Sequence, residues 1–304
     1  MDLITALTQR LRARCPRLEL REYEPMSRHT SFRIGGPARL MALPRSREEA
    51  VRAVQAAMEL GIRPFYLGNG SNLLVADRGY EGFILKTGGM DQVREVNRRL
   101  RAESGIPLSR LAVAALDRGL AGLEFAHGIP GSLGGAVTMN AGAYGGEMVQ
   151  VLTAVTFLDG EGHVVTLPVE ACRLTYRHSD FTEHPERLIL EAEFELRQGD
   201  GSESRAKMEE LARRRKEKQP LEYPSAGSTF KRPEGYFAAA LIEQCGLKGR
   251  RVGGAQVSEK HAGFVINRGD ATCADVLALV EEIRAAVFRE TGVTLELEVR
   301  TLGL

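Results

Sequence analysis

Two glycine-rich runs hold the residues of this chain that are best suited to bind a cofactor. The first is Leu67-Gly-Asn-Gly-Ser-Asn72, and the second extends from Gly128 to Gly145. Glycine allows a positive φ and lets a ligand approach the backbone amides closely, while Asn and Ser add short hydrogen-bonding groups. Two such loops can hold a diphosphate and a flat ring, which are the two parts of a flavin dinucleotide. On the loops alone, the alternative that they are only tight turns stays open.

Neither run fits a common nucleotide-binding template. The first run has no third glycine opening a helix, and it has no Lys followed by Ser or Thr. These absences exclude the Rossmann fingerprint and the P-loop. We therefore expect a different dinucleotide-binding fold.

Three segments outside the glycine runs hold polar residues that could do chemistry. Arg177 stands in the polar segment Tyr176–Phe181, Ser228 stands in a loop of small residues, and Glu296 and Glu298 alternate along an expected strand. The sequence shows no spacing typical of metal ligands or of a nucleophile with its base, so we expect no metal. Taken singly, each position is better explained by a structural role. Their combination with the glycine runs favours an active site.

Length and charge narrow the class of protein. A chain of 304 residues suits two or three domains, and a net charge of +1 argues against nucleic acid as the main partner. Basic clusters lie in the last third, at 213–218, 231–232 and 248–251, where they either hold an anionic ligand or form solvated surface.

Cysteine usage and hydropathy indicate a cytoplasmic protein. The four cysteines have no CxxC spacing, so we expect reduced, inert thiols. The first residues lack the long apolar region of a signal peptide, and no apolar run has the length of a membrane span.

Periodicity predicts alternating helices and strands. Ser46 and Glu49 form a capping box for a helix over 47–60, and the section from 149 to 197 is rich in strands. The polar segment 198–204 is the best candidate for a linker. The elements expected after it are helices over 203–217, 235–245 and 272–290, and strands over 252–257, 262–266 and 293–300.

Five motifs occur in the order typical of one enzyme family. They are the two glycine runs, Tyr176-Arg177 with Ser179 and Phe181, Ala226-Gly-Ser228, and Leu295-Glu-Leu-Glu-Val-Arg300. Over about residues 25 to 304 the chain resembles the UDP-N-acetylenolpyruvoylglucosamine reductases, the MurB family of peptidoglycan synthesis. The short span between Arg197 and the Ala-Gly-Ser loop resembles the type II branch, which lacks an insertion that caps the substrate.

The resemblance implies an α+β fold with a two-lobed FAD-binding domain of the vanillyl-alcohol-oxidase (PCMH) type and a smaller α/β substrate-binding domain. We expect FAD-binding lobes over 1–85 and 86–200 and the substrate-binding domain over 201–304. The implied reaction is NADPH-dependent reduction of UDP-N-acetylglucosamine enolpyruvate to UDP-N-acetylmuramate through non-covalent FAD. We expect a monomer. Two alternatives are an FAD-dependent oxidase of a hydroxy acid or sugar, and a flavin or nucleotide-sugar binding protein without turnover.

The resemblance also implies roles for particular residues. Arg177 would steady the enolic intermediate, Ser228 would donate a proton, and Glu298 would assist. The residues expected to bind substrate are Tyr176, Lys218, Arg232 and His261. Those expected to bind FAD are Leu67, Gly68, Asn69, Gly70, Ser71, Asn72, Pro130, Gly131, Gly134, Gly135, Ala136, Asn140, Ala141, Gly142 and Tyr144. One departure is the segment 101–107, which has fewer glycines than this resemblance leads us to expect.

Overall fold

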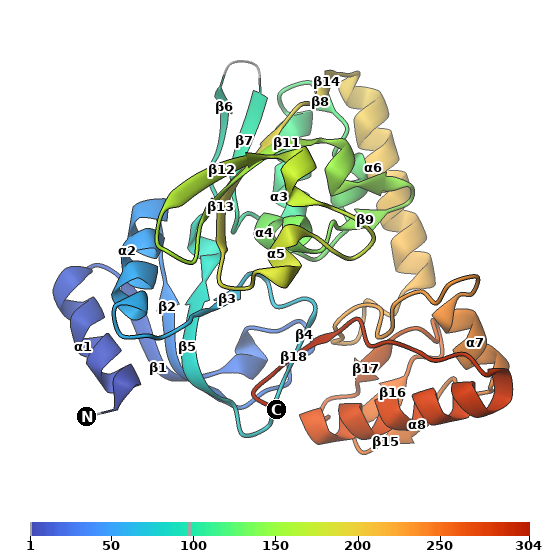
Figure 1. The fold of residues 1–304 in the computed structure, drawn as a ribbon. Helices are drawn as coiled ribbons and strands as arrows, with labels where there is room; N and C mark the ends of the chain where they lie inside the picture. The colour runs from blue at the N-terminus through green and yellow to red at the C-terminus, as the bar shows by residue number, and fades with distance from the viewer. Residues whose placement is uncertain (1, 97–98) are drawn as a thin grey trace. The chain divides into compact units, whose positions relative to one another are not determined.

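The computed structural model describes residues 2–96 and 99–304 (Figure 1). The chain divides into two compact units. The first consists of Met1–Glu22, Leu40–Asn69 and Gly82–Arg214, and the second of Tyr23–Arg39, Gly70–Glu81 and Arg215–Leu304. The division into three domains at residues 85 and 200 stays a prediction.

The first unit is built on two sheets. One has the strand order β1-β2-β5-β3, with β3 and β5 parallel. The other has the order β12-β11-β13-β7-β6, and all its neighbouring strands are antiparallel. The strands are β1 (Glu19–Pro25), β2 (Pro37–Leu43), β3 (Phe65–Leu67), β5 (Tyr80–Lys86), β6 (Val93–Val96), β7 (Arg99–Glu103), β11 (Leu152–Leu158), β12 (Val164–Pro168) and β13 (Leu188–Phe194). Short pairs are β8 (Leu120–Ala121) with β14 (Arg197–Gln198), and β9 (Gly142–Ala143) with β10 (Gly146–Glu147). The sequence also predicts a strand over 93–97; β6 corresponds to it, and position 97 lies outside the described residues.

Helices connect these strands. They are α1 (Leu3–Arg14), α2 (Arg47–Met58), α3 (Leu108–Leu116), α4 (Leu133–Thr138), α5 (Asp180–Glu183) and α6 (Gly201–Lys218). The predicted capping box of α2 forms only in part: the Ser46 side chain accepts a hydrogen bond from the Glu49 backbone N–H, but the Glu49 carboxylate accepts from the backbone N–H of Arg45 instead of that of Ser46. The linker expected over 198–204 is wrong. The Asp200 carboxylate accepts hydrogen bonds from the backbone N–H and the hydroxyl of Ser202, and α6 begins at Gly201.

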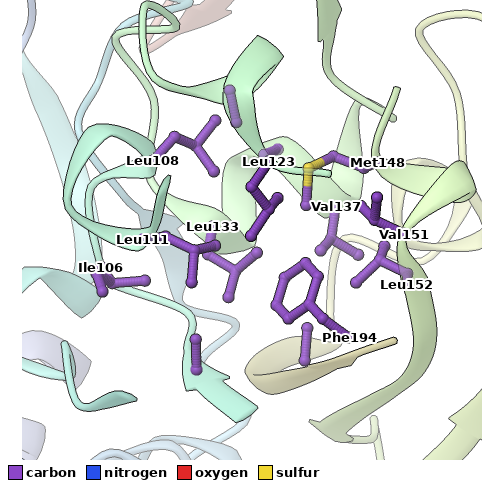
Figure 2. Packing of buried hydrophobic residues seen from close by; sticks show 14 of the residues in the cluster. Ile106, Leu108, Leu111, Leu123, Leu133, Val137, Met148, Val151, Leu152 and Phe194 are labelled. Atoms are coloured by element: carbon purple, nitrogen blue, oxygen red, sulfur yellow. The ribbon is translucent and has the colours of Figure 1, made fainter. Parts of the chain in front are cut away.

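The core of the first unit has two parts. One lies around β7, β11 and β13 with α3 and α4, and Figure 2 shows part of it, with Phe194, Leu133 and Val137 among the labelled residues. The other part packs α1 and α2 against β2 and β5. Every residue of β13 is buried, including two glutamates, so this strand reads as a continuous buried run rather than an alternating one. Glu193 is tolerated there because Arg99 and Arg101 pair with its carboxylate.

The second unit contains a small antiparallel sheet and two helices. The sheet has the order β15 (Arg251–Val252), β16 (Ala255–Val257), β17 (Val265–Asn267), and α8 (Cys273–Thr291) packs against its first two strands and against α7 (Ala238–Gln244). A parallel pair joins β4 (Leu73–Val75) to β18 (Arg300–Leu302). The strand expected over 293–300 is wrong for most of its length, since only an isolated bridge at Leu297 precedes β18. Among the described residues, no helix is long and apolar enough to cross a membrane.

Candidate active site

The two glycine-rich runs meet within the first unit. A Cβ atom added to Gly68 would lie 2.0 Å from Oγ of Ser132, so only glycine permits this approach. Ser132 directly precedes α4, whose first turn contains Gly134 and Gly135. The Gly134 backbone N–H donates to the carbonyl of Ser104 at 2.7 Å. The start of the first run and the middle of the second therefore face one region of this unit.

Gly135 and Gly70 differ in what surrounds them. A Cβ on Gly135 would meet nothing closer than Oγ of Ser132, at 3.7 Å, and Gly135 is exposed. Gly70, in the second unit, is buried with φ +61°, and a Cβ there would lie 2.1 Å from the carbonyl oxygen of His29. Gly135 leaves room that a ligand can use, whereas Gly70 is required by the fold itself.

Asn140 links the second glycine run to the segment that carries Arg177. It is buried, with φ +41°, and its side-chain N–H groups donate to Glu147 at 3.0 Å and to the Thr175 carbonyl at 3.2 Å. Its side-chain oxygen accepts from the backbone N–H of Val149 at 3.0 Å. Because its polar atoms are used in this way, the structure gives Asn140 a positioning role in the loop.

Arg177 lies in a constrained turn. Its φ is +54°, a conformation that is uncommon for residues with a Cβ, and its guanidinium lies over the Tyr176 ring, 5.5 Å from the centroid. Two residues later, the Ser179 hydroxyl donates to the carbonyl of Thr138 at the end of α4, at 2.7 Å. This bond and the Asn140 contacts fix the turn against the second glycine run.

The end of the first glycine run belongs to the second unit, where it contacts the segment of Glu298. The Asn72 side-chain N–H donates to the carbonyl of Glu298 at 3.0 Å. The Arg300 backbone N–H donates in turn to the carbonyl of Asn72 at 3.1 Å. A residue expected to bind FAD therefore also positions a residue expected to assist catalysis.

Ser228 and Glu298 lie on adjoining segments of the second unit. The Glu298 backbone N–H donates to the carbonyl of Thr229 at 2.9 Å, and Phe230 and Leu297 form a bridge beside it. Ser228 is exposed and follows Gly227, whose φ of +78° makes the sharp turn. Backbone pairing thus brings together two of the three predicted catalytic residues, while Arg177 belongs to the first unit.

The structure separates the two glutamates that the sequence places on one face. The Glu296 side chain is 71% exposed and pairs with Lys231 at 3.0 Å. Glu298 is partly buried and is fixed by the contacts of its backbone with Thr229 and Asn72. This difference favours Glu298 as the residue suited to assist a reaction.

Three of the four residues expected to bind substrate belong to the second unit, and Tyr176 belongs to the first. Lys218 is exposed at the last position of α6. Arg232 is exposed, and its guanidinium lies 3.9 Å from the centroid of the Phe237 ring. Phe237 is itself 60% exposed, so this pair presents a cation and an aromatic ring to solvent.

His261, the remaining member, is partly buried. Its Nδ1 accepts from the backbone N–H of Gly263 at 3.2 Å, and its ring packs edge-on against Phe264. Burial lowers the pKa of His261, and the nearby Lys248 lowers it further. Burial therefore favours the neutral imidazole of His261.

Two residues to which the sequence reasoning gave no role stand out. Burial lowers the pKa of the guanidinium of Arg300, the first residue of β18. Ser104 is 1% exposed, and its hydroxyl has no hydrogen-bond partner among the described residues. Arg300 is the last residue of the motif Leu295-Glu-Leu-Glu-Val-Arg300, and Ser104 lies in the segment 101–107, which has few glycines. Neither sequence pattern indicates that these residues are buried.

Several other side chains that could react or bind a metal ion are either buried thiols or already paired. Burial raises the pKa of Cys172 and of Cys273 to about 11, as expected of inert thiols. Asp180, Glu183 and His184 lie close enough to hold a metal ion, but Arg173 and Arg187 already bind the Asp180 carboxylate.

The donors near the glycine runs fit a dinucleotide. Closely approaching backbones, the open side of Gly135 and the unpaired hydroxyl of Ser104 all belong to one region of the first unit. Backbone amides and hydroxyls are the usual ligands of a diphosphate.

Comparison with known proteins agrees with this geometry. Residues 38–168 match the model of the FAD binding domain, and residues 219–302 match the C-terminal domain of UDP-N-acetylenolpyruvoylglucosamine reductase. The reductase of Caldanaerobacter subterraneus subsp. tengcongensis is 49% identical over 92% of each chain, and that of Clostridium novyi is 49% identical over 91% of this chain and 90% of its own. The crystal structure of the Thermus caldophilus enzyme superposes with a TM-score of 0.80, at 35% identity, over 94% of this chain and 99% of its own.

The fold and the site define an α+β flavoprotein with an FAD-binding domain. The second unit contains the C-terminal domain that accompanies it. The chain belongs to the UDP-N-acetylenolpyruvoylglucosamine reductase family.

Proposed function

We propose that this chain reduces UDP-N-acetylglucosamine enolpyruvate to UDP-N-acetylmuramate, with NADPH as the electron donor and non-covalent FAD as the cofactor. The observation that carries the proposal is the hydrogen bond of 2.9 Å from the Glu298 backbone N–H to the Thr229 carbonyl, since it pairs the segment of Glu298 with the segment of Ser228. Membership in the reductase family supports the same reaction. We further propose a monomer that works in the cytoplasm, where nucleotide sugars and NADPH are found.

When bound and reduced by NADPH, the flavin would supply the hydride that reduces the enolpyruvyl double bond. Negative charge then develops on the substrate carboxylate, and a guanidinium held in place beforehand stabilises that charge more than it stabilises the ground state. Arg177 suits this role because the backbone of its turn is fixed by Ser179 and, through Thr175, by Asn140.

A proton must then reach the carbon of the enolate. The Ser228 hydroxyl is a weak acid, so it can donate only to a strongly basic carbon at hydrogen-bond distance. Its exposed place on a tight turn leaves the hydroxyl accessible to substrate. Glu298, on the adjoining segment, would assist this transfer.

The remaining residues would hold the two substrates. Lys218 and Arg232 would provide cations for a diphosphate. His261 would provide a polar ring edge, and Tyr176 would provide an aromatic surface. The residues proposed for FAD are the fifteen named in the sequence analysis, six from Leu67 to Asn72 and nine between Pro130 and Tyr144.

The visible spectrum of the purified protein tests the proposal. We expect a flavin band that NADPH bleaches in the absence of oxygen and that the enolpyruvyl substrate restores. Acid or heat denaturation should release all the yellow colour. Reduced flavin that oxygen reoxidises and the substrate does not would favour an oxidase instead.

A further inference from the structure

Ser104 is held by its backbone between the second glycine run and the core sheet. Its N–H donates to the carbonyl of Leu190 in β13 at 3.0 Å, and its carbonyl accepts from Gly134 at 2.7 Å. A Cβ added to Gly134 would lie 3.1 Å from that of Ser104. The Ser104 side chain thus adjoins the loop where both glycine runs meet.

Its hydroxyl is buried without a partner. The residue is 1% exposed, and Oγ makes no hydrogen bond to any described residue. A buried hydroxyl that forms no hydrogen bond destabilises a fold relative to alanine at the same place. Ser204, another buried serine of this unit, has a partner, because its hydroxyl donates to Glu124 at 2.6 Å.

We propose that Ser104 is an FAD-binding residue whose hydroxyl donates a hydrogen bond to an oxygen or ring nitrogen of the bound cofactor. The inference rests on the FAD binding of the proposed function and adds a residue to that site. Ser104 belongs to the segment 101–107, which has fewer glycines than the family resemblance leads us to expect.

Titration of the apoprotein with FAD, monitored by the quenching of flavin fluorescence, tests this proposal. Ser104→Ala should raise the Kd for FAD about two- to tenfold if the acceptor is neutral, and about ten- to a hundredfold if it is a phosphate oxygen. The melting temperature of Ser104→Ala apoprotein should equal or exceed that of the wild type, because the variant lacks the unpaired hydroxyl. Ser204→Ala is the matched control and should do the reverse, melting earlier with an unchanged Kd.

The outcomes are distinct. A Kd for Ser104→Ala within twofold of the wild-type value would overturn the inference and would mean that water completes the hydroxyl's hydrogen bonding. Wild-type apoprotein that binds no FAD would instead overturn the proposed function. A shift of the visible flavin bands in Ser104→Ala would place the acceptor on the ring, and unchanged bands with a weaker Kd would place it on the phosphates or sugar.

Discussion

The side chain of Asn72 holds the backbone carbonyl of Glu298, 226 positions away in the sequence, at 3.0 Å. Asn72 ends the first glycine run, so a loop expected to bind FAD also fixes the segment of a residue expected to assist protonation. We therefore expect cofactor binding and the position of Glu298 to be coupled within one unit.

Replacing Asn72 with Ala should affect reduction of the enolpyruvyl substrate as well as stability. Loss of the donor leaves the Glu298 carbonyl without this hydrogen bond, which should lower the free energy of unfolding by about 1–3 kcal/mol. Displacement of Glu298 should slow flavin reoxidation by substrate about ten- to a hundredfold. The control is Asn267→Ala, since Asn267 donates to the Phe32 carbonyl and should affect stability alone. Unchanged reoxidation in Asn72→Ala would refute the coupling.

Gly135→Val should expel the cofactor without unfolding the protein. The sequence predicts this result for Val at Gly70 or at Gly135, but the surroundings of the two glycines differ. A side chain on Gly135 enters open space, whereas one on Gly70 collides with the His29 backbone. Gly135→Val should therefore keep an apoprotein melting temperature near that of the wild type and lose flavin absorbance, while Gly70→Val should also melt earlier. Full flavin content in Gly135→Val would place the cofactor elsewhere.

Lys218→Ala tests whether the basic end of α6 binds a diphosphate. If Lys218 makes one charge-assisted contact of about 1.5–3 kcal/mol, the Michaelis constant should rise about ten- to a hundredfold. Flavin content should stay the same. Lys216→Ala, a similar exposed cation on the same helix, is the control. If the Michaelis constants for substrate and NADPH both stay unchanged, Lys218 is only part of a solvated surface.

His261 should make stability depend on pH. Its pKa is lowered in the folded protein, so the unfolded chain takes up this proton first as the pH falls. Its contribution to stability should decline as the pH falls below the unfolded pKa of about 6.5. His261→Gln should flatten the melting-temperature profile between about pH 7 and pH 5. An equal slope in His261→Gln and wild type would contradict this assignment.

The features that the sequence predicted correctly are those that depend on neighbouring residues. The Ser46 cap and the helix it begins depend on neighbouring residues, and both are present. The linker at 198–204 was wrong because Asp200 caps a helix there, so a polar composition was mistaken for flexibility. The expected strand around Glu298 was wrong because its backbone groups bond to Thr229 and Asn72 instead of to a continuous neighbouring strand.

Contacts between residues that are distant in the sequence determine the environments of the candidate residues, which the sequence alone could not predict. Nothing in the spacing of Glu296 and Glu298 shows that one is exposed and ion-paired while the other is held beside Ser228. Burial of Ser104 likewise depends on Leu190 and Gly134, which are distant in the chain. The candidate residues could be named in advance, but their separate environments required the fold.

Proton donation by Ser228 is tested most sharply by the two half-reactions of the Ser228→Ala variant. Each half-reaction is measured separately, by rapid mixing at the flavin band. Reduction by NADPH needs no proton at a substrate carbon, so it should stay nearly intact. Reoxidation by the enolpyruvyl substrate should slow about a hundred- to ten-thousandfold, because positioned proton transfer is lost. Glu298→Gln should show the same asymmetry, and Ser225→Ala, at a serine of the same loop, should show neither effect. Equal slowing of both half-reactions by Ser228→Ala would contradict the account, since Ser228 would then shape the site rather than donate the proton.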